Sequence, residues 1–127
     1  MFYSDDNHPA RLREALALTG AVKADGRIAS DFGASLYLLT GLPSVYGRAQ
    51  KFMGRGYIDF GSLLAQLALS SGEEILVSLA GNLYNGSFFA GYTPLDIRSA
   101  CDSDTVQLAC AALLLRKSRL CEADFAA

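Results

Sequence analysis

The sequence contains few of the side chains that catalysis and metal binding need. It has one histidine, His8, in an expected N-terminal loop, which excludes most catalytic triads and favours an exposed structural residue. No serine, threonine or cysteine has a visible base to activate it. The three cysteines are widely spaced and none forms the C-x-x-C pair of a zinc site. We therefore expect a protein that is not an enzyme and that holds no cofactor and no metal.

Long apolar runs are also missing. The longest, Leu108 to Leu115, is far too short to span a bilayer, and the acidic N-terminal residues lack the apolar core of a signal peptide. An odd number of cysteines, Cys101, Cys110 and Cys121, favours reduced, buried thiols in an intracellular protein. The net charge of −2, from 11 basic and 13 acidic residues, gives no general attraction to nucleic acid or membranes. These features indicate a cytoplasmic protein without membrane contact.

The length of 127 residues suits one domain over 1–127, with loosely held ends at 1–7 and 120–127. The apolar content of 51% is high for so small a domain, so apolar surface can remain for a partner or for a second copy of the chain. No repeat or linker divides the sequence.

The clearest helix signal covers residues 72–85. Two serines precede it, each followed three positions later by a glutamate, so either register over 70–74 makes a capping box. One apolar stripe has three- and four-residue spacing: Ile75, Leu76, Leu79, Ala80 and Leu83. Asn85-Gly86 supplies a left-handed stop. We expect this to be the central, most buried helix.

Shorter helical patterns cover most of the remaining chain, at about 10–19, 30–40, 44–53, 60–67, 94–101 and 103–117. Tyr57–Phe60 alternates like a strand, but Asp59 is favoured as the cap of a short helix. The last helix carries an expected core stripe of Val106, Ala109, Cys110, Leu113, Leu114 and Lys117. The sequence therefore predicts an all-α, single-domain bundle of five to seven short helices around the helix at 72–85.

Three motifs that resemble functional sites have simpler interpretations. Residues 31–33 spell the Asp-Phe-Gly of kinases without any other kinase motif, and Gly54-x-Gly56 lacks a phosphate-binding lysine. The acidic pairs, Glu73 with Glu74 and Asp102 with Asp104, fall at helix starts, where capping accounts for them.

Two groups of side chains remain as candidate binding surfaces. Arg48, Lys51 and Arg55 lie at i, i+3 and i+7, so on one helix they would share a face that could follow a phosphate backbone; a solvated face is the favoured alternative. The bulky rings of Phe88, Phe89 and Tyr92 lie between glycines after the central helix. They either plug the core, which is favoured, or form an exposed anchor for a partner.

Several motifs in order along most of the chain resemble a small uncharacterised helical family of Gram-positive bacteria and their phages and mobile elements. They are Met1-Phe2-Tyr3-Ser4, Ser70-Ser71-Gly72-Glu73, Leu79-Ala80, Asn82-Leu83-Tyr84-Asn85-Gly86 and Thr93-Pro94-Leu95-Asp96. The resemblance assigns no site residue. It implies a cytoplasmic protein carried on a mobile element and acting by binding, as anti-CRISPR proteins do.

The leading hypothesis is thus a non-catalytic protein that occupies the surface of a host protein, for example as an inhibitor of host defence or CRISPR. Phe88, Phe89 and Tyr92 are its candidate partner-binding residues, and a homo-oligomer is compatible with it. The alternative is a small nucleic-acid-binding regulator that uses Arg48, Lys51 and Arg55.

Overall fold

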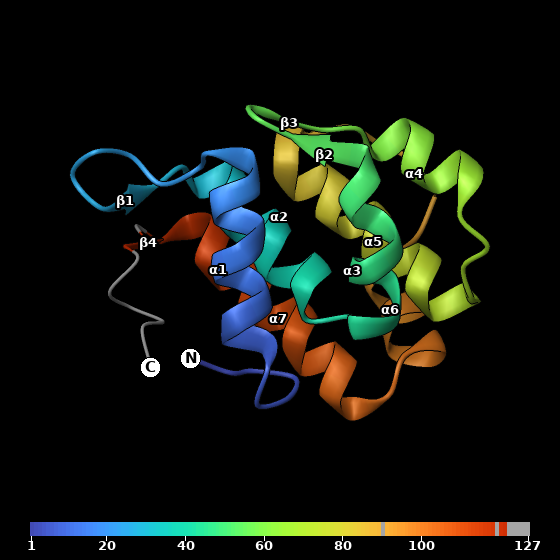
Figure 1. Cartoon of the computed structure of the whole chain (residues 1–127). Coiled ribbons are helices and arrows are strands. Elements are labelled where there is room, and N and C mark those ends of the chain that lie inside the picture. Colours follow the sequence, from blue (N-terminus) through green and yellow to red (C-terminus); the bar gives the residue numbers. More distant parts are fainter. Residues whose placement is uncertain (90, 119, 122–127) are drawn as a thin grey trace.

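The computed structural model describes residues 1–89, 91–118, 120 and 121, and within them seven α-helices form a single bundle (Figure 1). The α-helices are α1 (His8–Thr19), α2 (Ser30–Thr40), α3 (Pro43–Ala49), α4 (Phe60–Gln66), α5 (Ser71–Asn85), α6 (Pro94–Ala100) and α7 (Ser103–Lys117). A 3₁₀ turn, η1 (Gln50–Phe52), follows α3. The expected all-α bundle is confirmed.

Two small antiparallel ribbons join parts of the bundle. Strand β2 (Met53–Gly54) pairs with β3 (Tyr57–Ile58) in a hairpin, and β1 (Arg27–Ile28) pairs with β4 (Leu120–Cys121) near the end of the described chain. The hairpin corrects the expected helix over 44–53. The α-helix ends at Ala49, the 3₁₀ turn covers Gln50–Phe52, and Met53 belongs to the hairpin, whose turn Gly56 closes with a φ of 81°.

Capping residues account for the helix starts that the sequence predicts. At α5, the Ser70 hydroxyl accepts the Glu73 amide at 3.2 Å and the Glu73 carboxylate accepts the Ser70 amide at 2.9 Å, so the first of the two possible capping boxes is used. Gly86, with φ of 78°, ends that helix. Thr93 and Asp96 form a second capping box at α6, and the Asp59 and Asp102 carboxylates cap α4 and α7 by accepting the amides of Ser62 and Thr105.

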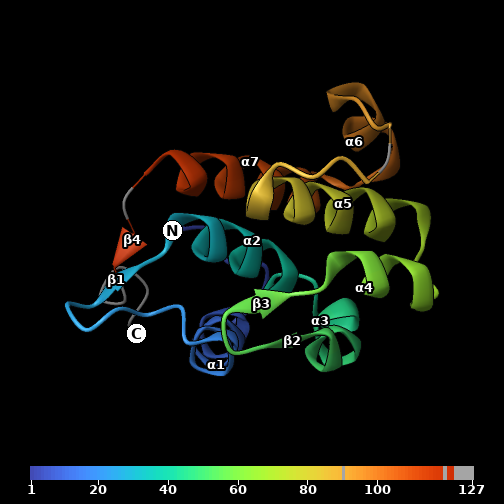
Figure 2. The same cartoon turned by 90° about the horizontal axis from the view of Figure 1, so that it is seen from above.

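Helix α2 is the most deeply buried element. Its residues 33–40 are buried without a break, and it lies between α5 and α7 on one side and α1 and α3 on the other (Figure 2). Helix α5 is also well buried, but one of its expected core residues, Leu79, is only partly covered. The centre of the bundle is therefore α2, and not α5, which the sequence predicts to be the central helix.

The expected core stripe of α7 is rotated in the structure. The buried residues are Leu108, Ala109 and Ala112, whereas Leu113 and Leu114 are 50% and 70% exposed. Cys110 is also exposed, so the expectation of a buried thiol there is wrong; Cys101 is partly buried, and both are free thiols. Leu108 and two alanines form the buried side of α7, with Leu108 packed against Gly41 at the end of α2, and Leu113 and Leu114 lie on the exposed side.

His8 is buried at the start of α1, which contradicts the expected exposed loop residue. Its Nδ1 accepts the Ser4 amide at 3.1 Å and its Nε2 donates to the Tyr37 carbonyl at 2.8 Å. Both ring nitrogens are thus used by the neutral imidazole. Burial lowers the pKa of His8 to about 4, although the hydrogen bond to Tyr37 opposes that shift.

Contacts also hold the N-terminal residues, which the sequence predicts to be loose. The Tyr37 hydroxyl donates to the Phe2 carbonyl, and the Tyr3 ring meets the His8 ring edge-on with centroids 5.4 Å apart. Most of the other expected loose end, 120–127, lies outside the described residues.

Because the chain has one histidine, its titration gives an unambiguous test of this packing. The unfolded chain binds a proton at His8 near pH 6.5 and the folded protein only near pH 4, so protons favour the unfolded state between these values. The free energy of unfolding should therefore fall by about 2 kcal/mol from pH 7 to pH 5, measured by denaturant titration.

A His8→Gln variant should show a flatter pH profile over the same range, whatever its own stability. Imidazole NMR signals of the folded native protein that titrate near pH 6.5 would contradict the burial of His8.

Candidate functional site: an aromatic pocket on α5

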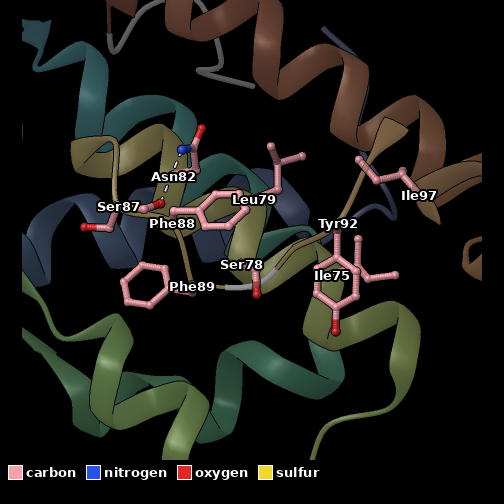
Figure 3. Close-up of a pocket in the computed structure, with 9 residues that line it drawn as sticks. All are labelled: Ile75, Ser78, Leu79, Asn82, Ser87, Phe88, Phe89, Tyr92 and Ile97. Carbon is pink, nitrogen blue, oxygen red and sulfur yellow. Dashed lines mark hydrogen bonds between the residues drawn. The ribbon is translucent and has the colours of Figure 1, made fainter. Parts of the chain in front are cut away.

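A pocket of about 170 Å³ lies where the segment after α5 folds back over that helix (Figure 3). Its apolar walls are Ile75, Leu79, Phe88, Phe89, Tyr92 and Ile97. Its polar lining residues are Ser78, Asn82 and Ser87. The structure thus brings all three sequence-predicted aromatic residues, Phe88, Phe89 and Tyr92, to one site.

The three aromatic side chains differ in how far they are covered. Phe88 is 78% exposed, Phe89 39% and Tyr92 36%. The Phe89 ring lies 6.2 Å from the Phe60 ring, and it fits over Gly81, where an added Cβ would come within 2.6 Å of a ring atom. Phe89 is therefore partly a plug, as the sequence favours, whereas Phe88 is an exposed ring.

A row of aromatic rings connects the pocket with the core. Phe89 lies beside Phe60, and the centroids of the Phe60 and Tyr84 rings are 5.7 Å apart. The Tyr84 ring in turn lies 5.1 Å, centroid to centroid, from the ring of Phe32 on α2. The Tyr84 hydroxyl also accepts the Ile58 amide at 3.3 Å. The inner wall of the pocket is consequently built on the packed bundle.

Short polar contacts shape the start of the segment. The Asn82 side chain donates to the Ser87 carbonyl at 3.2 Å, and the Asn85 side chain accepts the Ser87 amide at 3.0 Å. Together with the left-handed Gly86, these bonds turn the chain back over α5, which places Phe88 at the mouth of the pocket (Figure 3).

Ser78 is a polar residue in the lining that the sequence analysis does not single out. It is 7% exposed, and its hydroxyl is the one buried side-chain N or O atom without a hydrogen-bond partner among the described residues. Other buried hydroxyls donate to carbonyls: Thr19 to Ala15, Thr40 to Leu36 and Ser35 to Ala80. Ser78 lies beside the apolar stripe of α5 and not within it, so the spacing of the apolar residues gave no signal for its burial.

Negative charge lies beside the pocket. A second hollow of about 350 Å³ adjoins it, shares Ile75 and Tyr92 with it, and is also lined by Asp96. Desolvation, and after it the carboxylates of Glu74 and Asp96, raise the pKa of Tyr92. In the described part of the chain, neither hollow is lined by a lysine or an arginine.

The three cations of the alternative surface come from different elements. Arg48 is on α3, Lys51 on η1 and Arg55 in the turn of the β2–β3 hairpin, so the single helical face that their spacing suggested does not form. Arg48 donates to the Ser44 carbonyl at 3.0 Å and to the Ala68 carbonyl at 2.9 Å. The Lys51 ammonium lies 5.2 Å from the centroid of the Phe52 ring.

The other motifs have structural roles. The Asp31 carboxylate accepts the amide of Phe32, and Gly54 and Gly56 belong to the hairpin. Glu73 and Asp102 cap helices, and the Ser70 amide, with the Ser44 hydroxyl next, lowers the pKa of Glu73. No group of three histidine, cysteine or acidic side chains among the described residues is placed to hold a metal ion.

No family model, curated protein or solved structure matches the chain. Within the described residues, no helix is both long and apolar enough to cross a membrane.

Two glycine substitutions test how Phe89 is seated. In Gly81→Ala the new methyl group would come within 2.6 and 2.9 Å of Phe89 ring atoms and 3.2 Å of Phe60, so Phe89 should leave its position and the NMR signals of the loop should shift. Gly47→Ala is the control, because nothing lies within 4 Å of its new methyl group in α3.

The control should gain about 0.5–1 kcal/mol in unfolding free energy from the better helix propensity of alanine, and Gly81→Ala should gain less or lose stability. An equal gain in both variants, with the loop signals unchanged, would contradict the packing of Phe89 over Gly81.

Proposed function

We propose that the protein is a non-catalytic binding protein that docks on a partner protein through the aromatic pocket on α5. The observation that carries the proposal is the exposure of Phe88, 78%, at the mouth of a pocket that Phe89 and Tyr92 also line. Aromatic anchors beside pockets are typical of the energetic centre of protein interfaces. Further apolar surface lies on the adjoining helix α6, where Leu95 is 64% exposed.

The chemistry available elsewhere favours binding over catalysis. The single histidine uses both ring nitrogens in hydrogen bonds to the backbone and is remote from solvent. The pocket itself offers a serine hydroxyl and an amide, but no lining histidine, lysine or cysteine within the described residues that could activate a nucleophile.

The resemblance to proteins of phages and mobile elements supports a more specific setting. In it, the protein works in the cytoplasm of a bacterium and occupies the surface of a host component, for example one that takes part in CRISPR or another defence. The alternative, nucleic-acid binding through Arg48, Lys51 and Arg55, has less support because Arg48 is engaged by two carbonyls.

Affinity purification from the native host tests the proposal when three forms of the protein are compared. These are the unmodified chain, Phe88→Ala, and Tyr57→Ala as a control for an aromatic residue that is 51% exposed on β3, away from the pocket. The unmodified protein and the control should retain a stoichiometric protein partner. Phe88→Ala should bind that partner about fivefold more weakly or worse, with an unchanged melting temperature.

Nuclease treatment and a salt series separate the two functions. Capture of the partner should survive nuclease, and its dependence on salt should not change when Arg48, Lys51 and Arg55 are neutralised together. Nuclease-sensitive capture that weakens steeply with salt and depends on these three cations would overturn the proposal in favour of the alternative.

A further inference from the structure

Four basic side chains from distant parts of the sequence converge at one end of the bundle. They line a hollow of about 280 Å³ between strand β1, the start of α2 and the end of α7: Lys23, Arg27, Arg116 and Lys117. Both views of the fold place these three segments at the same end of the molecule (Figure 1, Figure 2). The rest of the described lining is 28–30 and Ser118, so no acidic residue of the described chain lines this basic hollow.

Arg116 is held at the wall of the basic hollow in a fixed orientation. Its Nε donates to the Leu83 carbonyl at 2.8 Å and its Nη1 to the Ser30 hydroxyl at 3.2 Å. A guanidinium has five N–H donors, so these two bonds orient the group and leave other donors for a ligand. The Ser30 hydroxyl accepts in this contact and can donate its own proton to a further acceptor.

The nearby acids do not neutralise the four cations. The Asp25 carboxylate lies 3.4 Å from Nε of Arg27, but both side chains are more than half exposed, so this pair contributes little. The Asp31 carboxylate accepts the amide of Phe32. Neither Lys23 nor Lys117 forms an ion pair with an acid of the described chain. The basic hollow therefore has an excess of positive charge.

The backbone of α2 adds to this charge. The helix begins at the basic hollow with Ala29 as its N-cap, and alanine has no side-chain oxygen to accept the first amides. The first turn of a helix carries a partial positive charge, which favours an anion. The helix end reinforces the four cations, which remain the observation that carries the site.

The arrangement of the cations selects the kind of anion. A nucleic-acid backbone is a line of phosphates, whereas these four cations surround one hollow. The volume of the basic hollow is close to the lower limit of small-molecule sites, about 300 Å³. Phosphate oxygens suit both the arginine fork and the lysine ammonium group. Two linked phosphate groups provide enough oxygens and charge to contact several of these cations at once.

We propose that the basic hollow binds a compact phosphate anion of the diphosphate class, either free or as part of a nucleotide. Lys23 and Lys117 pair with its charge, and Arg116 and Ser30 donate to its oxygens. The bound anion connects β1, α2 and α7. This inference goes beyond the proposed docking function and does not depend on it, because the basic hollow and the aromatic pocket share no described residue.

Titration with three anions at constant ionic strength tests the ligand class. Pyrophosphate should shift the NMR signals of residues 23–30 and 116–118 and raise the melting temperature, because it binds the folded protein. It should bind about tenfold more tightly than orthophosphate, the equivalent of one more charge-assisted hydrogen bond. Acetate, a single carboxylate, should cause no comparable shifts.

ADP distinguishes the two sources of the diphosphate. Tighter binding of ADP than of pyrophosphate would assign the basic hollow to a nucleotide. Equal or weaker binding of ADP would assign it to the free anion.

Lysine variants connect the binding to the basic hollow. Lys23→Gln and Lys117→Gln remove exposed charges and should fold normally, and each should weaken pyrophosphate binding about 3- to 10-fold. Lys51→Gln is the control with the same change in net charge. Lys51 is exposed in η1, outside the basic hollow, so its replacement should leave the affinity unchanged.

The inference is overturned if pyrophosphate causes no shifts at the basic hollow, if acetate binds as tightly, or if both Lys23→Gln and Lys117→Gln bind pyrophosphate like the native protein. A single-stranded oligonucleotide that binds more tightly than pyrophosphate, with shifts that extend over 48–55, would also overturn it, in favour of a nucleic-acid surface. These outcomes are separate from partner capture through Phe88, which none of the anion titrations measures.

Discussion

The burial of helix α2 on all sides is the constraint on which the rest of the structure depends. Because residues 33–40 have no solvated face, their polar groups must be satisfied from within the protein: the Ser35 hydroxyl donates to the Ala80 carbonyl on α5, at 3.0 Å. At its C-terminal end, α2 receives His8 on the Tyr37 carbonyl and Arg11 on the Thr40 carbonyl, at 2.8 and 2.7 Å. These bonds join α1 and α5 to the same central helix. The pocket lies on the outer side of α5, so the helix that forms its floor is held in place by these contacts with α2.

Sequence reasoning predicted the helices better than their depth. Helix starts depend on one or two residues that act locally, which is why the caps Ser70, Asp59 and Thr93 were identifiable from the sequence. Depth depends on which neighbours a helix meets, and small residues hide that information. Within α2, alanine, serine and glycine are buried as completely as leucine, so the helix does not stand out as the centre. In α7, too, small residues are buried, Ala109 and Ala112, so its buried face differs from the expected one and Cys110 is exposed.

The candidate site shows the same division between local and long-range information. Rings between glycines were a visible signal, so Phe88, Phe89 and Tyr92 could be selected from the sequence. How far Phe89 is covered depends on Gly81 and Phe60, which lie in other elements and contact Phe89 only in the folded chain. The i, i+3, i+7 spacing of the cations was misleading because it assumed a continuous α-helix, whereas α3 ends at Ala49 and is followed by η1 and the strand β2. Local spacing alone cannot report such an interruption.

Native-state amide hydrogen exchange tests most directly the central claim, that a lightly held aromatic segment lies on a rigid bundle centred on α2. Amides of residues 34–40 should exchange only through global unfolding, with the largest protection in the protein. Amides of 87–89 and 91–100, where α6 has no buried residue, should exchange through local opening at a much lower free energy. Equal protection in the two regions, or faster exchange in α2 than in α6, would contradict the account.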